Sequence, residues 1–200
     1  AWLLVDEAHS FGVFGEHGLG LCEHLGLLDE VDFILGTFSK SLAGIGGFCV
    51  SPHAELELLR LASRPYIFTA SSSPAVIAGT REALKLLVQG QSLRKQLHRN
   101  MERLYAGAHR LGFTTGASQP GPVAALILPD KETALRHWQA LLSEGVYANL
   151  MIPPATPAGL CLLRLSLSAA HTDEDIDAIV EALAIAQARS GQNLPQQAQA

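Results

Sequence analysis

A lysine in a loop rich in hydroxyl and glycine residues is the first sign of chemistry in this sequence. Lys40 lies in the segment GTFSKSLAGIGG (residues 36–47), between two short apolar runs. A lysine amine is a nucleophile only when neutral, and a buried, polar-lined position favours the neutral amine needed for Schiff-base chemistry. The hydroxyls of Thr37, Ser39 and Ser41, with glycine N–H groups, suit a phosphate. An exposed lysine in a surface turn is the alternative, which the flanking apolar runs disfavour.

A carboxylate and an imidazole follow the first apolar run of the chain. The string Asp-Glu-Ala-His-Ser occupies residues 6–10, directly after Trp2–Val5. Open α/β sheets bind ligands at the carboxyl ends of their strands. A carboxylate there can bind a metal, act as a base or hold a cationic heterocycle, and the structural alternative is a cap on the next turn. The string also matches the DEAH box of helicases, but no phosphate-binding loop or basic nucleic-acid footprint accompanies it.

Together the two segments contain the groups that pyridoxal phosphate requires. The cofactor needs an amine for its aldehyde, an anion for its ring nitrogen, donors for its phosphate and a group near its phenolic oxygen. Lys40, Asp6, the hydroxyl loop and His9 are groups of these types.

The same segments resemble the α-oxoamine synthases, pyridoxal-phosphate enzymes of fold type I. That family has an Asp-Glu-Ala-His-Ser/Gly loop with spaced glycines after it, followed by a Thr-x-x-Lys segment. The strings GTFSKSLAGIGGF, RPYIFTAS and PPATP are similar to the branch that condenses L-serine with a long-chain acyl-CoA. Sister enzymes that form aminooxononanoate, aminolevulinate or aminoketobutyrate more often have Thr-Leu-Gly-Lys, where this chain has Phe38-Ser39 before the lysine. The resemblance covers Trp2 to about Val180.

The resemblance implies roles for the residues of both segments. Asp6 pairs with the pyridinium nitrogen, and His9 lies beside the phenolic oxygen. Thr37 and Ser39 lie close to the phosphate. Lys40 forms the Schiff base with the cofactor and later moves protons.

Two further residues are implicated outside these segments. Thr69 matches a family residue that reaches the phosphate of the other subunit in a homodimer with shared active sites; a helix-entry turn is the alternative. Arg164 alternates with Leu163 and Leu165 along a predicted strand, so its side chain lies on the opposite face from theirs. Its guanidinium suits bidentate binding of a carboxylate. The family uses the matching arginine for the amino-acid carboxylate, and a solvated strand face is the alternative.

The implied reaction is a decarboxylative condensation of L-serine with palmitoyl-CoA or a similar acyl-CoA. It yields 3-oxosphinganine, coenzyme A and carbon dioxide, the first step of sphingolipid biosynthesis. One alternative is another α-oxoamine synthase, such as 8-amino-7-oxononanoate synthase or glycine C-acetyltransferase. A non-catalytic partner subunit is a second alternative, which the presence of Lys40 and Asp6 disfavours.

Elements that can position these residues follow from the hydrophobic pattern. Trp2–Val5 predicts a buried strand, and Phe33–Leu35 and Gly47–Val50 predict two more. The pair Ser73-Pro74 predicts the start of a helix that runs to about Val88. Apolar residues spaced by three and four from Leu93 to Leu111 predict a second helix, which Gly112 ends.

The last third of the chain predicts a strand–helix–strand–helix order. The expected ranges are Val123–Leu128, Thr133–Glu144, Leu162–Ser168 and a final helix from Thr172, with Asp175 completing a capping box. We therefore expect an α/β protein of the pyridoxal-phosphate-dependent transferase fold type I. Residues 1–111 are expected to form the C-terminal part of the large domain with a linking helix, 112–189 a small α/β domain, and 190–200 a disordered tail.

Composition narrows the remaining possibilities. The 200 residues are 48% hydrophobic with a net charge of −5, which gives no reason to expect nucleic-acid or anionic-lipid binding. Three scattered cysteines without metal-ligand spacing predict reduced thiols, a cytoplasmic location and no metal. No apolar run approaches the roughly 20 residues of a membrane span. No role is assigned to six histidines expected on helix or loop surfaces: His17, His24, His53, His98, His109 and His137.

The start of the sequence predicts a fragment. It opens without an initiator Met, directly on a strand pattern, so we expect the C-terminal half of a longer enzyme that is inactive alone. The preceding part is then expected to supply the residue that stacks on the cofactor ring and further phosphate donors.

Overall fold

The computed structural model of the chain describes residues 1–191, in two compact units, Ala1–Arg94 and a second that begins at Lys95. The boundary lies inside helix α5 (Gln91–Arg110), earlier than the 111/112 boundary expected from the sequence. Of the expected tail, Ser190 and Gly191 belong to the last helix, and 192–200 lie outside the described residues. Each unit is described by itself.

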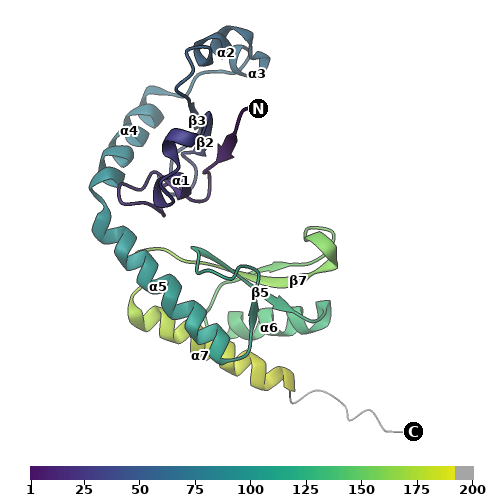
Figure 1. The fold of residues 1–200 in the computed structure, drawn as a ribbon. Helices are drawn as coiled ribbons and strands as arrows, with labels where there is room; N and C mark the ends of the chain where they lie inside the picture. The colour runs from purple at the N-terminus through teal and green to yellow at the C-terminus, as the bar shows by residue number, and fades with distance from the viewer. Residues whose placement is uncertain (192–200) are drawn as a thin grey trace. The chain divides into compact units, whose positions relative to one another are not determined.

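The first unit is built on a three-stranded sheet with the order β1-β2-β3. Strands β1 (Leu4–Asp6) and β2 (Phe33–Thr37) run parallel, with Asp6 opposite Leu35. Strand β3 (Gly47–Val50) pairs antiparallel with β2, with Gly47 opposite Thr37. The three strands are drawn in purple and blue in Figure 1. The last two confirm the expected strands, and β2 continues two residues beyond Leu35.

The first strand lies at Leu4–Asp6, not at the expected Trp2–Val5, and the segment is not buried as its apolar sequence predicted. Trp2, Leu3 and Leu4 are 74%, 49% and 56% exposed. The physical reason is that β1 is an edge strand of a narrow sheet, so one of its edges has no neighbouring strand among the described residues. The Trp2 ring lies near the rings of Phe33 and His53, at centroid distances of 5.6 and 5.9 Å.

Helices and connecting loops make up the remainder of the first unit. Helix α4 (Pro74–Gln89) begins as predicted: the Ser73 side chain accepts a hydrogen bond from the N–H of Val76, and Pro74 occupies the first turn. The shorter elements are α1 (Leu21–His24), a 3-10 turn at Leu28–Glu30, α2 (Leu56–Ala62) and α3 (Arg64–Ile67).

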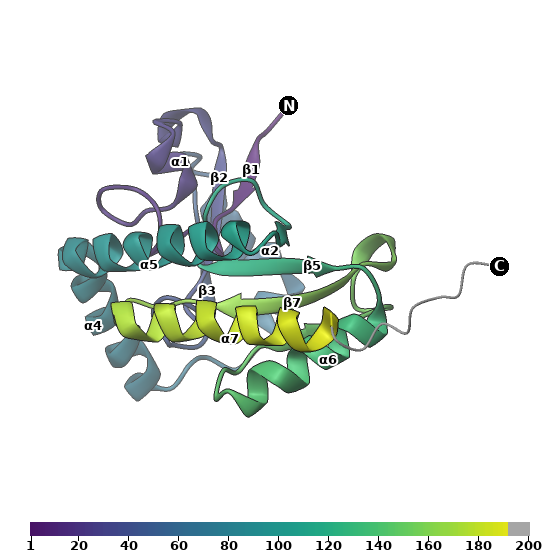
Figure 2. The ribbon, with the colours of Figure 1, turned by 90° about the horizontal axis from the view of Figure 1, so that it is seen from below.

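The second unit is a four-stranded antiparallel sheet with helices on one face. The strands have the order β4-β5-β7-β6 and comprise Thr114–Thr115, Val123–Leu128, Cys161–Ser166 and Asn149–Met151. Figure 2 shows α7 (Asp173–Gly191) between α5 and α6 (Lys131–Ser143) across this sheet. Gly107 of α5 permits the close approach, because a Cβ there would lie 2.4 Å from Val180 Cγ2 of α7.

Capping explains where the helices of the second unit begin and end. Thr172 and Asp175 form the predicted reciprocal cap of α7, with N···O distances of 3.2 and 2.8 Å. Helix α6 begins two residues before the expected Thr133, because the Asp130 side chain accepts from the Thr133 N–H at 2.8 Å and is therefore the cap. Gly112 follows α5 with φ +83°, as its predicted stop.

Candidate cofactor site

Parallel pairing of β1 and β2 places the two motifs at one edge of the first sheet. Asp6 is the last residue of β1, and the lysine loop leaves the end of the adjacent β2 at Thr37. Since parallel strands carry their carboxyl ends at the same edge, the Asp-Glu-Ala-His turn and the lysine loop emerge together. This is the edge at which open α/β sheets bind ligands.

Direct packing also joins the two loops. Gly12, in the glycine-rich loop after β1, has φ +82°, and a Cβ there would lie 2.5 Å from Ser41 Cβ. The rings of Phe11 and Phe48 meet edge-on at 4.9 Å, and Phe38 contacts Phe48 at 5.5 Å. The lysine loop, the glycine loop and strand β3 therefore pack against one another.

The lysine loop is a closed polar turn. The N–H of Phe38 donates to the Gly46 carbonyl at 2.9 Å, and the N–H of Gly44 donates to the Phe38 carbonyl at 2.7 Å. The hydroxyls of Thr37 and Ser39 lie 2.8 Å apart, and that of Thr37 also donates to the Gly46 carbonyl at 3.1 Å. Lys40 itself is exposed, so the buried position expected from the flanking apolar runs is wrong: the runs lie on either side of the loop in sequence but do not cover the lysine. The loop therefore carries the Thr37 and Ser39 hydroxyls and the Lys40 amine within four residues, at the sheet edge where ligands bind.

Asp6, the last residue of β1, and His9, in the turn that follows, are both exposed. One carboxylate oxygen of Asp6, Oδ1, accepts from the N–H of Ala8 at 2.8 Å. One of the two carboxylate oxygens of Asp6 thus caps the turn, as the structural alternative expected. The other oxygen has no hydrogen-bond partner within residues 1–191, and the same holds for the His9 ring.

Glu7 is a buried carboxylate next to the site that the sequence did not single out. It is 1% exposed, although Asp6 beside it is exposed. Its carboxylate accepts from the N–H groups of Leu21 and Cys22 at 2.8 and 2.6 Å, and from the hydroxyl of Ser10. A Cβ at Gly20 would lie 2.4 Å from its Oε2. Glu7 therefore ties the far end of the glycine loop to the turn that carries Asp6 and His9.

The electrostatics of Glu7 fit a permanently charged anchor. Burial raises the pKa of its carboxyl, but hydrogen bonds from Cys22, Ser10 and Leu21 outweigh burial and hold the pKa below its ordinary value of 4.5. Burial, with the hydrogen bond and charge of Glu7, raises the pKa of the Cys22 thiol to about 11. The Asp-Glu string does not indicate that Glu7 is buried and Asp6 exposed, because both are acidic residues at the end of the same strand.

Thr69 follows helix α3, where its hydroxyl donates to the carbonyl of Pro65. This contact is the one expected of a helix-end turn residue. Its side chain is nevertheless exposed, and so is the adjacent Phe68, at 81%.

Arg164 lies in β7 of the second unit, paired with Ala125 and Asn149 on the neighbouring strands. The expected alternation is confirmed: Leu163 and Leu165 are buried, at 0% and 3% exposure, and Arg164 is half-buried on the opposite face of the strand. Its Nε atom is buried and has no hydrogen-bond partner among the described residues. A buried donor without an acceptor is costly, so this guanidinium is well suited to an external anion.

Residues 1–191 contain no group of three or more His, Cys, Asp and Glu side chains that could hold a metal ion. No helix there is both long and apolar enough to cross a membrane. Cys22 and Cys161 are buried, Cys49 is half-buried, and all three are free thiols.

Comparison with known protein families shows to which family the chain belongs. The family model for aminotransferase class I and II matches residues 1–183. The chain belongs to the aminotransferase class I and II family. Its fold is fold type I of the pyridoxal-phosphate-dependent transferases, as expected, and the resemblance to α-oxoamine synthases is confirmed.

Three members of the aminotransferase class I and II family illustrate the similarity. A serine palmitoyltransferase of Caulobacter vibrioides is 54% identical over 180 residues, covering 90% of this chain and 44% of the relative. An 8-amino-7-oxononanoate synthase of Stutzerimonas stutzeri is 40% identical, covering 92% and 47%. A solved structure of a serine palmitoyltransferase variant from S. paucimobilis, with a bound PLP–myriocin aldimine, has a TM-score of 0.92 at 43% identity, covering 96% and 48%. The chain thus spans about half the length of these relatives.

Proposed function

We propose that the complete protein condenses L-serine with a long-chain acyl-CoA such as palmitoyl-CoA, forming 3-oxosphinganine. In the net reaction, the α-carbon of serine bonds to the acyl carbon, the C–S bond of the thioester breaks, and the serine carboxylate leaves as carbon dioxide. The observation that carries the proposal is the meeting of the Asp6 turn and the lysine loop at one sheet edge. The 54% identity to a serine palmitoyltransferase supports the choice of substrates.

The groups at this edge fit pyridoxal phosphate by type. Lys40 offers an exposed amine, Asp6 has one carboxylate oxygen without a partner within residues 1–191, and Thr37 and Ser39 supply adjacent hydroxyls. When bound, the cofactor supplies an electron sink for negative charge at the amino acid's α-carbon.

Each residue then has a distinct task. Lys40 would hold the cofactor's aldehyde carbon covalently and, once released, move the proton at the α-carbon. Asp6 would keep the ring nitrogen protonated, and His9 would hydrogen-bond the phenolic oxygen. Thr37 and Ser39 would bind the phosphate.

Substrate and subunit contacts complete the proposal. The unpartnered Nε of Arg164 supports its assignment to the carboxylate of the amino acid. We propose a homodimer with shared active sites, in which the exposed Thr69 reaches the phosphate bound by the other subunit; in that state its hydroxyl would have to leave the Pro65 carbonyl.

Borohydride trapping tests the cofactor assignment. The complete, cofactor-loaded protein is reduced with borohydride, and the modified peptide is mapped by mass spectrometry. We expect the cofactor on Lys40 and no adduct in Lys40→Ala. The matched control is Lys85→Ala, which removes an exposed lysine paired with Glu82 at 3.0 Å and should leave the adduct intact. A covalent adduct that survives Lys40→Ala would refute the assignment.

A sister reaction is the second candidate, favoured by the 40% identity to an 8-amino-7-oxononanoate synthase. Product analysis separates the two. The complete protein is offered serine, alanine or glycine, each with palmitoyl-CoA, acetyl-CoA or a dicarboxylic acyl-CoA, and the aminoketone is identified by mass. A dominant product from any pair other than serine and a long-chain acyl-CoA would overturn the proposed specificity. Absence of every aminoketone, with cofactor bound, would favour the non-catalytic partner subunit.

A further inference from the structure

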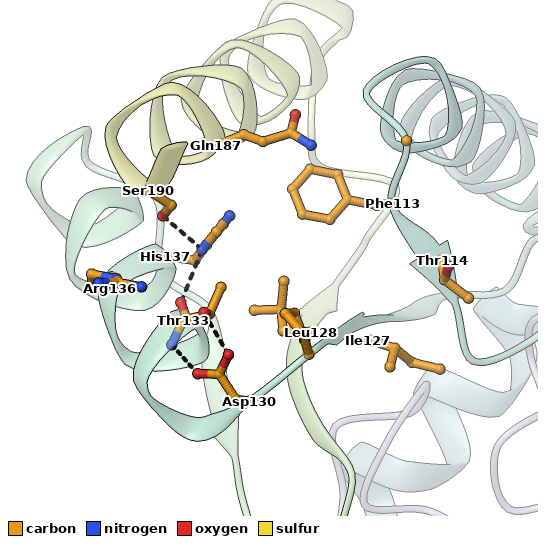
Figure 3. A pocket seen from close by; sticks show the side chains of 12 residues that line it. Phe113, Thr114, Ile127, Leu128, Asp130, Thr133, Arg136, His137, Gln187 and Ser190 are labelled. Carbon is orange, nitrogen blue, oxygen red and sulfur yellow. Dashed lines mark hydrogen bonds between the residues drawn. The ribbon is translucent and has the colours of Figure 1, made fainter. Parts of the chain in front are cut away.

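A cavity of about 670 Å³ lies in the second unit, apart from every residue of the proposed cofactor site. Figure 3 shows it between the end of β5, helix α6 and the last turns of α7. Phe113, Ile127 and Leu128 make its apolar walls. Cavities of about 300–1,000 Å³ with mostly apolar walls and a few placed polar groups are typical of small-molecule sites.

His137 is the polar group buried in this wall. The sequence predicted a surface position for it, which is wrong: the residue is 4% exposed. The reason is tertiary, because the face of α6 that carries His137 packs against α7, where Ser190 lies 3.1 Å from its Nδ1. The ring also meets Phe113 edge-on at a centroid distance of 6.0 Å.

The contacts of Nδ1 decide which nitrogen carries the proton. Nδ1 lies 2.9 Å from the backbone carbonyl of Thr133, which can only accept. The Ser190 hydroxyl donates its own proton to the Ala186 carbonyl at 2.9 Å, so its oxygen also faces Nδ1 as an acceptor. Nδ1 is therefore the N–H donor, and in the neutral ring Nε2 is left with its lone pair as an acceptor.

Nε2 has no partner within residues 1–191, and Figure 3 shows it directed into the space bounded by Phe113 and Leu128. Neighbouring polar groups are already engaged. Thr133 donates through both N–H and hydroxyl to Asp130, and the Gln187 amide donates to the Leu111 carbonyl at 2.8 Å. Arg136, whose Nε lacks a partner in the described part of the chain, extends away from the ring in Figure 3.

We propose that this cavity binds a neutral, mostly apolar small molecule that donates one hydrogen bond, from an N–H or O–H group, to Nε2 of His137. The apolar walls supply most of the contact area. The acceptor in the wall selects molecules with a donor, because a ligand that covers Nε2 without donating to it takes away its access to water and leaves it unpaired.

A pair of isosteric probes tests the proposal. Indole carries an N–H donor, and indene has a methylene in its place. Binding of each to the complete, cofactor-loaded protein is measured by equilibrium dialysis. We expect indole to bind more tightly than indene, and His137→Phe to weaken indole by roughly threefold to tenfold while leaving indene unchanged, as loss of one neutral hydrogen bond implies. The control His109→Phe changes an exposed histidine of α5 and should affect neither probe.

A second measurement uses the wild-type protein, so the test does not depend on whether His137→Phe folds. In the wild-type protein with ¹⁵N-labelled histidine, indole should shift the Nε2 resonance of His137, and indene should not. The proposal is overturned if indole does not bind at millimolar concentration, if both probes lose affinity equally in His137→Phe, or if the Nε2 resonance stays unmoved when indole is saturating.

Discussion

Gly12 lies directly against Ser41, the residue that follows Lys40: a Cβ at Gly12 would stand 2.5 Å from Ser41 Cβ and 2.6 Å from its hydroxyl oxygen. Gly12 belongs to the loop after Asp6, so the absence of one side chain lets two loops that are separated in sequence pack together. Glu7 holds the other end of the same loop through Leu21 and Cys22. Both contacts can be tested without assuming any reaction.

Gly12→Ala should separate the two loops. Its φ of +82° costs an alanine about 1–2 kcal/mol, and overlap with Ser41 adds to this. We expect a lower free energy of unfolding and a clear loss of cofactor retention on dialysis. Gly26→Ala is the matched control, because Gly26 also has a positive φ, +71°, with nothing within 4 Å of its Cβ position. Gly26→Ala should lose stability yet keep the cofactor, and equal cofactor loss in both variants would contradict the role of the contact.

Glu7→Gln should destabilise the complete protein by about 1.5–3 kcal/mol at neutral pH, because the new amide N–H₂ faces the N–H donors of Leu21 and Cys22. The folded-state pKa of Glu7 lies below 4.5, so its charge contributes stability that is complete above pH 4.5 and is lost as pH falls through the lowered folded value. The difference in unfolding free energy between wild type and variant should therefore shrink in acid. An exposed-site control, Glu102→Gln, should show no such dependence, and a difference that grows in acid would disprove the charged anchor.

Asp6→Asn tests the proposed anion for the ring nitrogen. The variant should still bind the cofactor, since the lysine loop is unchanged, but it should lose most exchange of the serine α-proton with solvent deuterium. The reason is that a neutral amide does not hold the ring nitrogen protonated. The NMR signal of the α-proton measures the rate, with Asp29→Asn at an exposed position as control. Exchange at a near-normal rate in Asp6→Asn would rule out this role.

Arg164→Lys tests carboxylate recognition by the second unit. The lysine keeps the charge but loses the bidentate fork, a contact of about 1.5–3 kcal/mol. Spectral titration should show weaker binding of serine and little change for an amino alcohol that lacks the carboxylate. Equal weakening of both ligands would mean that Arg164 has a structural role only.

The sequence by itself determined the local features of this protein. The Ser73 cap, the Thr172–Asp175 box and the Leu163–Leu165 alternation each depend on residues a few positions apart, and the structure has them as predicted. The sequence also showed which functional groups residues 6–10 and 36–47 carry, because side-chain identity alone determines the type of group.

Only the tertiary structure decided which of these groups are buried and which segments meet. Glu7 and Asp6 are adjacent carboxylates after one strand, yet Glu7 alone is enclosed, because the glycine loop folds back over it. His137 is enclosed because α7 packs on α6, and Leu4 is exposed on β1, which is an edge strand. Burial depends on contacts between residues far apart in the chain, and a local pattern of apolar and polar residues carries no information about the neighbour that will cover it.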